Sequence, residues 1–466
     1  PGVIRTVLMR GLDMEENSAI ANIRKFGSEP VFWELVNRYT GYVQEEGTSL
    51  LPLAAHILLT ALSVTMKASC LRGLEKQISD SQQPLCYSLV NEWMHSEDDD
   101  ALYEIARAVE EQYDLEKRFD ALEISELMNS ECFPCINECI LRRYMTEISE
   151  NIIKANDIVA AVEKRRTLKW YKRVRYYYDG LLQAAQMQQF YQANIGGFHI
   201  AEYAALWRAY TGDYCKMDHF YRQFHAAFGR SLKESSTVLD DLYKSVADYV
   251  ERLYKNWFLT SLGAQWTSLI REELEKNARL PELPQQTDFY RSFVAPVAAS
   301  GSRVFVIISD ALRYEVAVDL TGQLLRETKG DARISAVQGV FPSATKFGMA
   351  ALLPHRSLQL TKDANVLCDG EPTEGTAARE KILNRAHAGN VAISYKTLVS
   401  MKQAERREAI SGAGVVYIYH NTIDAVGDKA ATEDRVFDAC EQAILEIKNL
   451  VRMITNDMKG TNILIT

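Results

Sequence analysis

Apolar residues recur every three or four positions throughout residues 1–280. This spacing is the period of an α-helix that buries one of its faces. The segment from residue 51 to residue 62 shows it clearly, with apolar side chains at Leu51, Ala54, Ala55, Leu58, Leu59 and Leu62. Residues 1–280 are therefore predicted to form a helical region, in which antiparallel helices pack as an array without a repeat of fixed length.

A different pattern begins at residue 303. Three runs are continuously apolar and rich in β-branched or aromatic residues: Val304–Ile308, Val415–Tyr419 and Asn462–Ile465. Such runs, without polar alternation, are typical of strands buried on both faces of a parallel sheet. Helical patterns separate them, at Glu315–Arg326 and Glu433–Met453. Residues 303–466 are therefore predicted to be an α/β domain with a mostly parallel sheet between helices.

Prolines mark the junction between the two patterns. Pro281, Pro284 and Pro296 are expected to interrupt any helix in residues 281–302, so this segment is predicted to be a linker. The chain is thus assigned to the α + α/β class.

The composition narrows the function classes. The 466 residues are 47% hydrophobic and 25% charged, as in a globular protein with a sizeable core. The net charge of −9 argues against a protein that binds nucleic acid over its whole surface. The sequence contains no run of about 18 uncharged apolar residues, so no transmembrane helix is predicted. The first residues do not resemble a signal peptide. Eight scattered cysteines are typical of reduced proteins, which predicts a cytoplasmic location.

Three cysteines lie close together in sequence, at Cys132, Cys135 and Cys139. Three thiolates and a fourth ligand would hold a structural zinc ion, but no fourth ligand is near them in sequence. Buried thiols along a helix are the interpretation that we favour.

Two charged stretches in the helical region have alternative interpretations. Lys164–Arg175 interleaves seven Lys and Arg residues with aromatic residues. Such a mixture contacts DNA in some proteins, whereas in others the Arg side chains only cover aromatic rings. The acidic run Ser96–Asp100 is interpreted as the capped first turn of a helix. A surface that recruits a partner is its alternative.

Polar clusters are expected at the strand ends of the α/β domain. Ser309–Glu315 follows the first strand, Phe341–Met349 follows the apolar segment Ile334–Val340, and His420–Asp428 follows the strand at 415–419. Ligands of open α/β sheets bind beyond the carboxyl ends of the strands, so these three clusters are expected to meet there.

Taken one at a time, these residues have ordinary explanations. Asp310 could be a helix cap, and His420 could be a hydrogen-bonded histidine of the core. Asp424 and Asp428 could belong to a solvated acidic loop. Together they fit a divalent-metal site, because like charges four residues apart on a helix repel unless a cation lies between them.

Hydrolysis is the chemistry expected of such a site. A metal ion lowers the pKa of a coordinated hydroxyl, which would make Thr345 a usable nucleophile at neutral pH. A second ion would stabilise the leaving oxygen. Lys346 and Arg313 are candidates for contacts to phosphate oxygens, with surface salt bridges as the alternative.

The three clusters, in the forms Val304–Glu315, Phe341–Pro354 and Tyr419–Asp428, resemble the PglZ domain. PglZ proteins belong to the alkaline phosphatase superfamily and are core components of BREX phage-defence systems. The chain is most similar to the type A PglZ of type 1 BREX. The likeness is specific over residues 303–466, and the helical region resembles what precedes the domain in these proteins.

The resemblance implies a role for each matched residue. Asp310 matches the first metal-binding aspartate of the superfamily. Thr345 matches the Ser or Thr nucleophile, which also binds a metal ion. Asp424 matches the first residue of the superfamily's D-x-x-x-H pair, and Asp428 stands where that pair has its histidine. The complete site would hold two divalent ions. Because a carboxylate stands in place of an imidazole, zinc and manganese both remain candidates for these ions.

The resemblance also implies ligands beyond this sequence. In the superfamily, the strand that corresponds to Asn462–Ile465 leads into an Asp-His metal pair, and another ligand histidine lies further on. The sequence stops at Thr466. We therefore expect a piece of a longer protein, with its α/β domain truncated on the C-terminal side, that binds one metal ion or none and hydrolyses little substrate.

Two functions follow from the resemblance. The first is a metal-dependent phosphatase or phosphodiesterase of a BREX system that attacks with Thr345. The alternative is mainly a scaffold that binds other BREX proteins through the helical region, since helical arrays present large docking surfaces.

Overall fold

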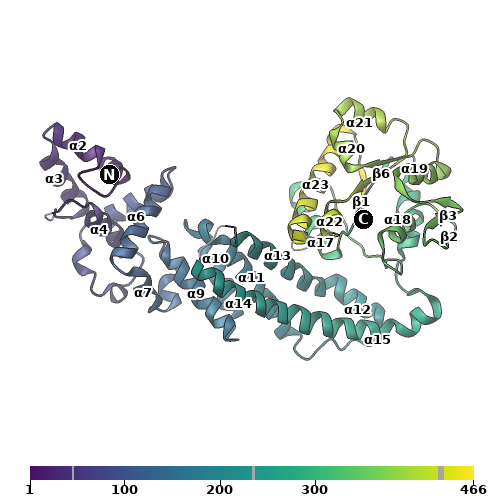
Figure 1. Ribbon diagram of the computed structural model, residues 1–466, viewed down its shortest axis with the longest axis horizontal. Helices are drawn as coiled ribbons and strands as arrows, with labels where there is room; N and C mark the ends of the chain where they lie inside the picture. Colours follow the sequence, from purple (N-terminus) through teal and green to yellow (C-terminus); the bar gives the residue numbers. More distant parts are fainter. Residues whose placement is uncertain (45–46, 234–236, 429–434) are drawn as a thin grey trace. The chain divides into compact units, whose positions relative to one another are not determined.

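The computed structural model describes residues 1–44, 47–233, 237–428 and 435–466 of the chain (Figure 1). These residues fall into two compact units. The first unit comprises residues 1–193 and 227–253, and the second comprises residues 194–226 and 254–466. The region predicted as helical, 1–280, therefore contributes to both units, since residues 194–226 and 254–280 pack with the α/β part.

Helices joined by loops make up the first unit. Helix α4 (Leu51–Leu62) is apolar on every side and buries ten of its 12 residues, more than the single face that the sequence pattern predicts. The other α-helices of this unit are α1 (Gly2–Met9), α2 (Ser18–Lys25), α3 (Glu29–Thr40), α5 (Gln83–Met94), α6 (Asp99–Gln112), α7 (Leu115–Asp120), α8 (Ile124–Leu127), α9 (Cys135–Ser149), α10 (Ala155–Arg165), α11 (Tyr171–Ala193) and α14 (Thr237–Glu251).

The second unit begins with helices as well. They include α12 (Tyr203–Ala209), the π-helix η3 (Tyr210–Tyr214), the first part of α13 (Cys215–Ser231), most of the π-helix η4 (Arg252–Leu259) and α15 (Thr260–Asn277). No helix in the described part of the chain is both long enough and apolar enough to cross a membrane.

The segment predicted to be a linker, 281–302, is structured. It contains η5 (Gln286–Asp288), η6 (Tyr290–Val294) and α16 (Ala295–Ala299). Pro296 lies in the first turn of α16, where a proline is tolerated because its missing N–H would have no helical partner. Phe289 and Val294 are buried in a core cluster of the α/β part. This segment therefore packs as part of that domain.

A parallel four-stranded sheet lies at the centre of the α/β part. Its strands are β1 (Val304–Ser309), β5 (Val391–Ser394), β6 (Val415–His420) and β7 (Asn462–Ile465), in the spatial order β5-β6-β1-β7. The three predicted strands are confirmed, and all six residues of β1 are buried, as its unbroken apolar run requires. The fold class predicted from the sequence is confirmed.

Helices cover both faces of this sheet, and the side chains of β1 alternate between the two layers. One layer contains Phe305 and Ile307 of β1, packed against α17 (Tyr314–Glu327), α20 (Tyr395–Ser400), α22 (Thr422–Gly427) and α23 (Val436–Asp457). The other layer contains Val306 and Ile308, packed against α18 (Thr345–Ala351), α19 (Gly375–Ala386) and a small antiparallel sheet of β2 (Leu358–Leu360), β3 (Val366–Cys368) and β4 (Glu371–Pro372). The helices predicted at 315–326 and 433–453 correspond to α17 and α23, although residues 433–434 lie outside the described residues.

One predicted strand end is wrong. Ile334–Val340 is not a strand of the sheet, because only Gln338 pairs, in an isolated bridge with Gln285. The segment carries Ser335, Gln338 and Gly339 among its apolar residues, so it lacks the continuous apolar character of the buried strands. The cluster at 341–349 therefore reaches the sheet through α18 and not through a strand.

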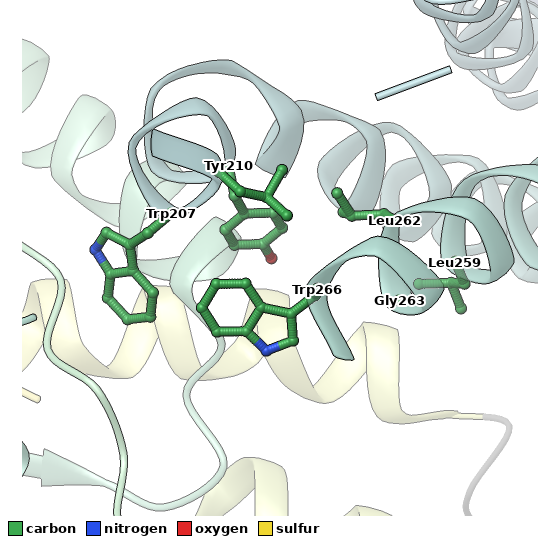
Figure 2. A pocket seen from close by; sticks show the side chains of 7 residues that line it. Trp207, Tyr210, Leu259, Leu262, Gly263 and Trp266 are labelled. Atoms are coloured by element: carbon green, nitrogen blue, oxygen red, sulfur yellow. The ribbon is translucent and has the colours of Figure 1, made fainter. Parts of the chain in front are cut away.

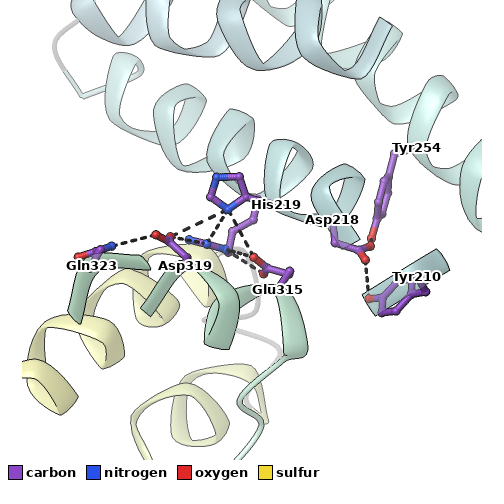
Figure 3. A network of polar contacts seen from close by, with 8 residues as sticks. Tyr210, Asp218, His219, Tyr254, Glu315, Asp319 and Gln323 are labelled. Atoms are coloured by element: carbon purple, nitrogen blue, oxygen red, sulfur yellow. Dashed lines mark hydrogen bonds and ion pairs between the residues drawn. The ribbon is translucent and has the colours of Figure 1, made fainter. Parts of the chain in front are cut away.

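A buried ionic network ties helix α13 to α17, the helix that follows β1 (Figure 3). The Nε of Arg222 donates to both carboxylate oxygens of Glu315, at 2.9 and 3.0 Å, and its Nη2 donates to Asp319 at 2.9 Å. Arg222 and Glu315 are both buried. The network fixes the first turns of α17, four residues beyond Asp310, to the helical part of the same unit.

Candidate active site

The second unit contains an apolar cavity. It has a volume of about 320 Å³ and lies between α12 and α15, with Trp207, Tyr210 and Trp266 in its wall (Figure 2). Its lining contains no charged side chain. A phosphate ester or a divalent ion needs charged or strongly polar partners, so this cavity is no candidate for the predicted chemistry.

Polar residues gather instead at the carboxyl end of the central strands. β1 and β6 are paired in register with Ser309 beside His420, so the residues that follow them emerge side by side. The backbone N–H of Asp310 donates to the carbonyl of His420, with an N···O distance of 2.9 Å. The chain then turns at Ala311, whose φ of 62° lies in the left-handed region. Asp310 is thus held next to the segment that leads into α22.

Two further carboxylates belong to α22. Asp424 lies in its first turn and Asp428 is its C-cap residue. Partial burial and the charges of Asp424 and Asp428 raise the pKa of Asp310. Burial and the charge of Asp428 also raise the pKa of Asp424. Asp310, Asp424 and Asp428, here called the carboxylate cluster, are therefore close enough to repel one another when ionised.

The donors of this cluster fit a divalent cation. Carboxylate oxygens are hard ligands, and a cation beside them would lower the pKa values that burial and repulsion raise. Among the residues that the structure describes, no group of three or more His, Cys, Asp or Glu side chains is already arranged to hold a metal ion. An ion would therefore have to draw these carboxylates together or take further ligands.

Thr345 is the first residue of α18, and its side chain is exposed. α18 packs in the sheet layer that contains Ile308, two residues before Asp310. Side chains of a strand alternate between its faces, so Asp310 follows Ile308 on the side of the sheet that α18 covers. Thr345 remains the predicted nucleophile, accessible to solvent in that layer.

The two predicted phosphate contacts differ in their surroundings. The Nζ of Lys346 lies 5.6 Å from the centroid of the Phe347 ring, and Lys346 is exposed. Burial raises the pKa of Asp218, and the hydrogen bonds from Tyr254 and Tyr210 and, to a smaller extent, the charge of Arg313 act against that increase. Asp218 accepts hydrogen bonds from the hydroxyls of Tyr210 and Tyr254, at 2.7 and 2.5 Å (Figure 3). Arg313 is itself exposed, so its side chain remains accessible to a ligand.

His420 is a hydrogen-bonded core histidine, as predicted. It is 1% exposed, and its two ring nitrogens lie 3.0 Å from the hydroxyl of Ser309 and 2.8 Å from a carboxylate oxygen of Glu446. Burial lowers its pKa. Both nitrogens are therefore occupied within the protein.

Sequence reasoning missed Arg379 and Tyr419. The guanidinium of Arg379, on α19, lies over the ring of Tyr419 with 4.6 Å between its Cζ and the ring centroid. The charge of Arg379 also acts on Asp310, where it opposes the increase in pKa. Arg379 is 69 positions away from Asp310 and belongs to no motif, so nothing in the local sequence indicated it.

The cysteines of the helical region are buried thiols, as favoured. Cys132, Cys135 and Cys139 are all buried, and burial raises the pKa of Cys132 to about 12. Burial also raises the pKa of Cys135 well above its usual value. Protonated thiols are poor metal ligands, so the geometry gives no support to a zinc site here.

The basic stretch Lys164–Arg175 and the acidic run Ser96–Asp100 meet in the first unit. Lys169 and Lys172 lie 3.0 and 2.6 Å from a carboxylate oxygen of Asp99, and Arg173 pairs with Asp100. The acidic first turn of α6 is confirmed, but its N-cap residue, Asp98, makes no capping hydrogen bond with its side chain. Cations from the basic stretch neutralise this turn, which leaves fewer of them available to DNA.

Comparisons with known proteins agree with the α/β part of this description. The model of the BREX system PglZ alkaline phosphatase-like domain matches residues 289–466. The "Alkaline phosphatase-like protein PglZ" of Bacillus cereus (strain H3081.97) is 36% identical over 456 residues, which cover 97% of this chain and 52% of that protein. The "Alkaline phosphatase-like protein BrxZ" of Escherichia coli O9:H4 (strain HS) is 33% identical over 473 residues, with coverages of 97% and 53%. The chain spans about half the length of the curated relatives it matches.

Proposed function

Because the chain belongs to the PglZ family, we propose that it is part of a BREX phage-defence protein whose α/β domain is a metal-dependent phosphohydrolase. The substrate class is a phosphomonoester or a phosphodiester. The observation that carries this proposal is the carboxylate cluster, in which three aspartates share one edge of a parallel sheet and in which burial and neighbouring carboxylates raise the pKa of Asp310 and Asp424.

Each residue has a role in this proposal. Asp310, Asp424 and Asp428 would hold divalent ions: their oxygen donors suit manganese, and the family resemblance keeps zinc as the alternative. The bound ions would supply Lewis acidity to the phosphoryl group. Thr345 would provide the attacking hydroxyl, which is exposed at the start of α18. Lys346 would contact phosphate oxygens from the next position.

The end of β7 bears on how the reaction should be assayed. The carbonyl of Thr466 accepts a hydrogen bond from the N–H of Ser309 at 2.8 Å, so β7 ends beside β1 at the edge where Asp310 lies. Any residue that followed this strand in a longer protein would enter at the same edge. The proposal is therefore tested on a protein of the relatives' full length.

The test is hydrolysis of 4-nitrophenyl phosphate and bis(4-nitrophenyl) phosphate in the presence of zinc or manganese. Thr345→Ala should lower kcat by at least about 1,000-fold, since it removes the attacking oxygen. Thr455→Ala is the matched control, because Thr455 is an exposed threonine on α23 and should leave kcat unchanged. Full activity of Thr345→Ala would rule out this mechanism.

A scaffolding role is a second candidate, favoured by apolar side chains exposed near the N-terminus. Phe26 is 77% exposed and Val31 and Leu35, one turn apart on α3, are 56% and 48% exposed. Exposed apolar side chains close together commonly mark protein–protein contacts. We propose that other BREX proteins bind here. Val31→Asp with Leu35→Asp should abolish their co-purification, whereas Ile152→Asp, at another exposed position, should not. Unchanged co-purification of the double variant would exclude this surface.

A further inference from the structure

Arg379 has no role in the proposed chemistry, although it lies beside the strands of the candidate site. Helix α19 carries three cations, Arg379, Lys381 and Arg385. Lys381 lies 2.9 Å from Glu371, and Arg385 pairs with the same carboxylate. Among the residues that the structure describes, Arg379 makes no ion pair within 4 Å. It is therefore the cation of this helix whose charge is not matched by an adjacent carboxylate.

Two contacts fix the orientation of the Arg379 guanidinium. Its Nε donates to the carbonyl of Thr373 at 2.9 Å, and its Cζ lies over the ring of Tyr419, 4.6 Å from the ring centroid. The hydrogen bond to Thr373 uses the Nε side of the group. The two terminal nitrogens, Nη1 and Nη2, form the opposite edge, and this edge is the fork that binds two oxygens of a phosphate or carboxylate at once.

The position of Tyr419 places the Arg379 guanidinium in the sheet layer beside the end of β1, where Asp310 follows. Tyr419 is paired with Ile308 of β1, and the next residue, His420, accepts the backbone hydrogen bond of Asp310. The ring of Tyr419 packs in the same layer as Ile308, the layer that also contains α18. The influence of the Arg379 charge on the pKa of Asp310 agrees with this placement. Arg379 thus joins Asp310 and the predicted nucleophile on one side of the sheet.

An anionic substrate needs such a cation. Bound divalent ions neutralise the three carboxylates at this edge, but a phosphate ester brings negative charge of its own that a further cation can match. A guanidinium that is oriented before the substrate arrives binds the phosphoryl oxygens without first losing side-chain freedom. The partly buried aromatic ring beside it also strengthens its electrostatic interactions by limiting the access of water.

We propose that Arg379 binds the phosphoryl group of the substrate through Nη1 and Nη2, and that the site selects ligands with two or more non-bridging phosphate oxygens. This inference rests on the proposed function, because it places the phosphate at the carboxylate cluster. It assigns the phosphate contact to a residue outside the sequence motifs and beyond the predicted Lys346 and Arg313.

The test measures the binding of inorganic phosphate by isothermal titration calorimetry, with metal-loaded full-length protein. A Thr345→Ala background removes turnover and keeps the measurement independent of activity. Arg379→Met should weaken phosphate binding by about 10- to 100-fold, the effect of losing a charge-assisted hydrogen-bonded pair. Arg379→Lys should restore part of the affinity, since it returns the charge without the fork. Arg385→Met, on the same helix, should change the affinity by less than about twofold.

The outcomes separate this inference from the proposed function. Phosphate binding that depends on Arg379 supports the inference even if no ester is hydrolysed. Hydrolysis with an unchanged phosphate affinity and an unchanged KM in Arg379→Met overturns the inference and leaves the proposed function standing. Absence of phosphate binding to the protein with the native Arg379 also overturns it. Thermal unfolding of Arg379→Lys verifies that the packing on Tyr419 survives, so a folding defect is not mistaken for lost binding.

Discussion

Two acidic clusters of this molecule behave in opposite ways. In the first unit, Asp99 lies beside Lys169 and Lys172, and the hydrogen bond with Lys172 is the main reason that its pKa falls to about 2. In the second unit, burial and mutual repulsion raise the pKa values of Asp310 and Asp424. One cluster is neutralised by cations of the chain, and the other gathers negative charge.

This difference indicates which acidic residues have a structural role. Where the chain provides counter-charges at hydrogen-bond distance, carboxylates hold helices together, as Asp99 and Asp100 of α6 do with the segment that precedes and opens α11. Where carboxylates lie together with less compensation, an external cation lowers the energy. The carboxylate cluster is of this second kind, which is why we assign it to metal binding.

The largest effect is expected at the most completely paired carboxylates, those that contact Arg222. Arg222→Met leaves Glu315 buried without its partner and should lower the free energy of unfolding by about 3–5 kcal/mol in urea denaturation. Arg326→Met, on the exposed side of α17, should change it by less than about 0.5 kcal/mol.

A double variant sharpens this first prediction. Glu315→Leu combined with Arg222→Met removes both buried charges and should recover part of the lost stability. If Arg222→Met alone is neutral, pairing within the chain is no guide to structural carboxylates, and the comparison between the clusters loses its basis.

The second prediction concerns Asp99. Asp99→Asn should lower the free energy of unfolding by about 1–2 kcal/mol near neutral pH, because Lys169 and Lys172 lose their common partner. A folded-state pKa of about 2, below the ordinary carboxyl value, means that this stabilisation is present at neutral pH and is lost as the pH falls toward 2. Chemical denaturation between pH 2 and pH 7 should therefore show the two proteins converging in acid. A constant difference across this range would contradict the pairing.

The third prediction has the opposite sign. Asp310→Asn should raise the free energy of unfolding of the metal-free protein by about 0.5–2 kcal/mol near neutral pH, since it relieves repulsion at the carboxylate cluster. The raised pKa means that the wild-type protein is most stable, relative to the variant, below the ordinary carboxyl range and loses stability as the pH rises through the folded-state pKa. The variant's advantage should therefore disappear in acid.

Thermal unfolding with a chelator present measures this effect. Asp363→Asn, at an exposed aspartate of the same domain, is the control and should have little influence on stability. Destabilisation by Asp310→Asn without metal would show that Asp310 is a structural residue like Asp99.

The smallest effect is expected for DNA binding by the basic stretch. Lys169, Lys172 and Arg173 are already paired with Asp99 and Asp100. Charge reversal of the exposed Lys164 and Arg166 should therefore change DNA affinity by less than about threefold at physiological salt. A fluorescence anisotropy titration at several salt concentrations checks this. A steep salt dependence that the reversal abolishes would restore DNA contact as a function of this region.

The sequence predicted the parts of the fold that depend on local pattern. The runs at β1 and β6 are buried on both faces and the run at β7 is partly buried, and their apolar composition identifies all three as strands. Parallel strands end at one edge, and this rule was enough to place Asp310 near Asp424. The prediction of a strand end after Ile334–Val340 was wrong, because this segment is only moderately hydrophobic and forms an isolated bridge instead of a buried strand.

Other features depend on contacts between distant residues. Nothing near Arg379 in sequence separates it from Lys381 and Arg385, and only the fold brings it to Tyr419 and Asp310. The pairing of Asp99 with Lys172 spans 73 positions and turns two features that looked like surfaces into one structural contact. The compact units likewise divide the helical region at residues 194, 227 and 254, where no change of composition marks a boundary.

A measurement of divalent-metal binding is the most direct test of the claim that the carboxylate cluster is a metal site. Isothermal titration of metal-free full-length protein with zinc or manganese should show stoichiometric binding. Asp310→Asn and Asp424→Asn should each weaken it by at least about tenfold, while Asp363→Asn should bind like the native protein. Equal metal binding by all four proteins would place the metal site elsewhere, and no binding at all would remove the basis for assigning hydrolysis to this edge of the sheet.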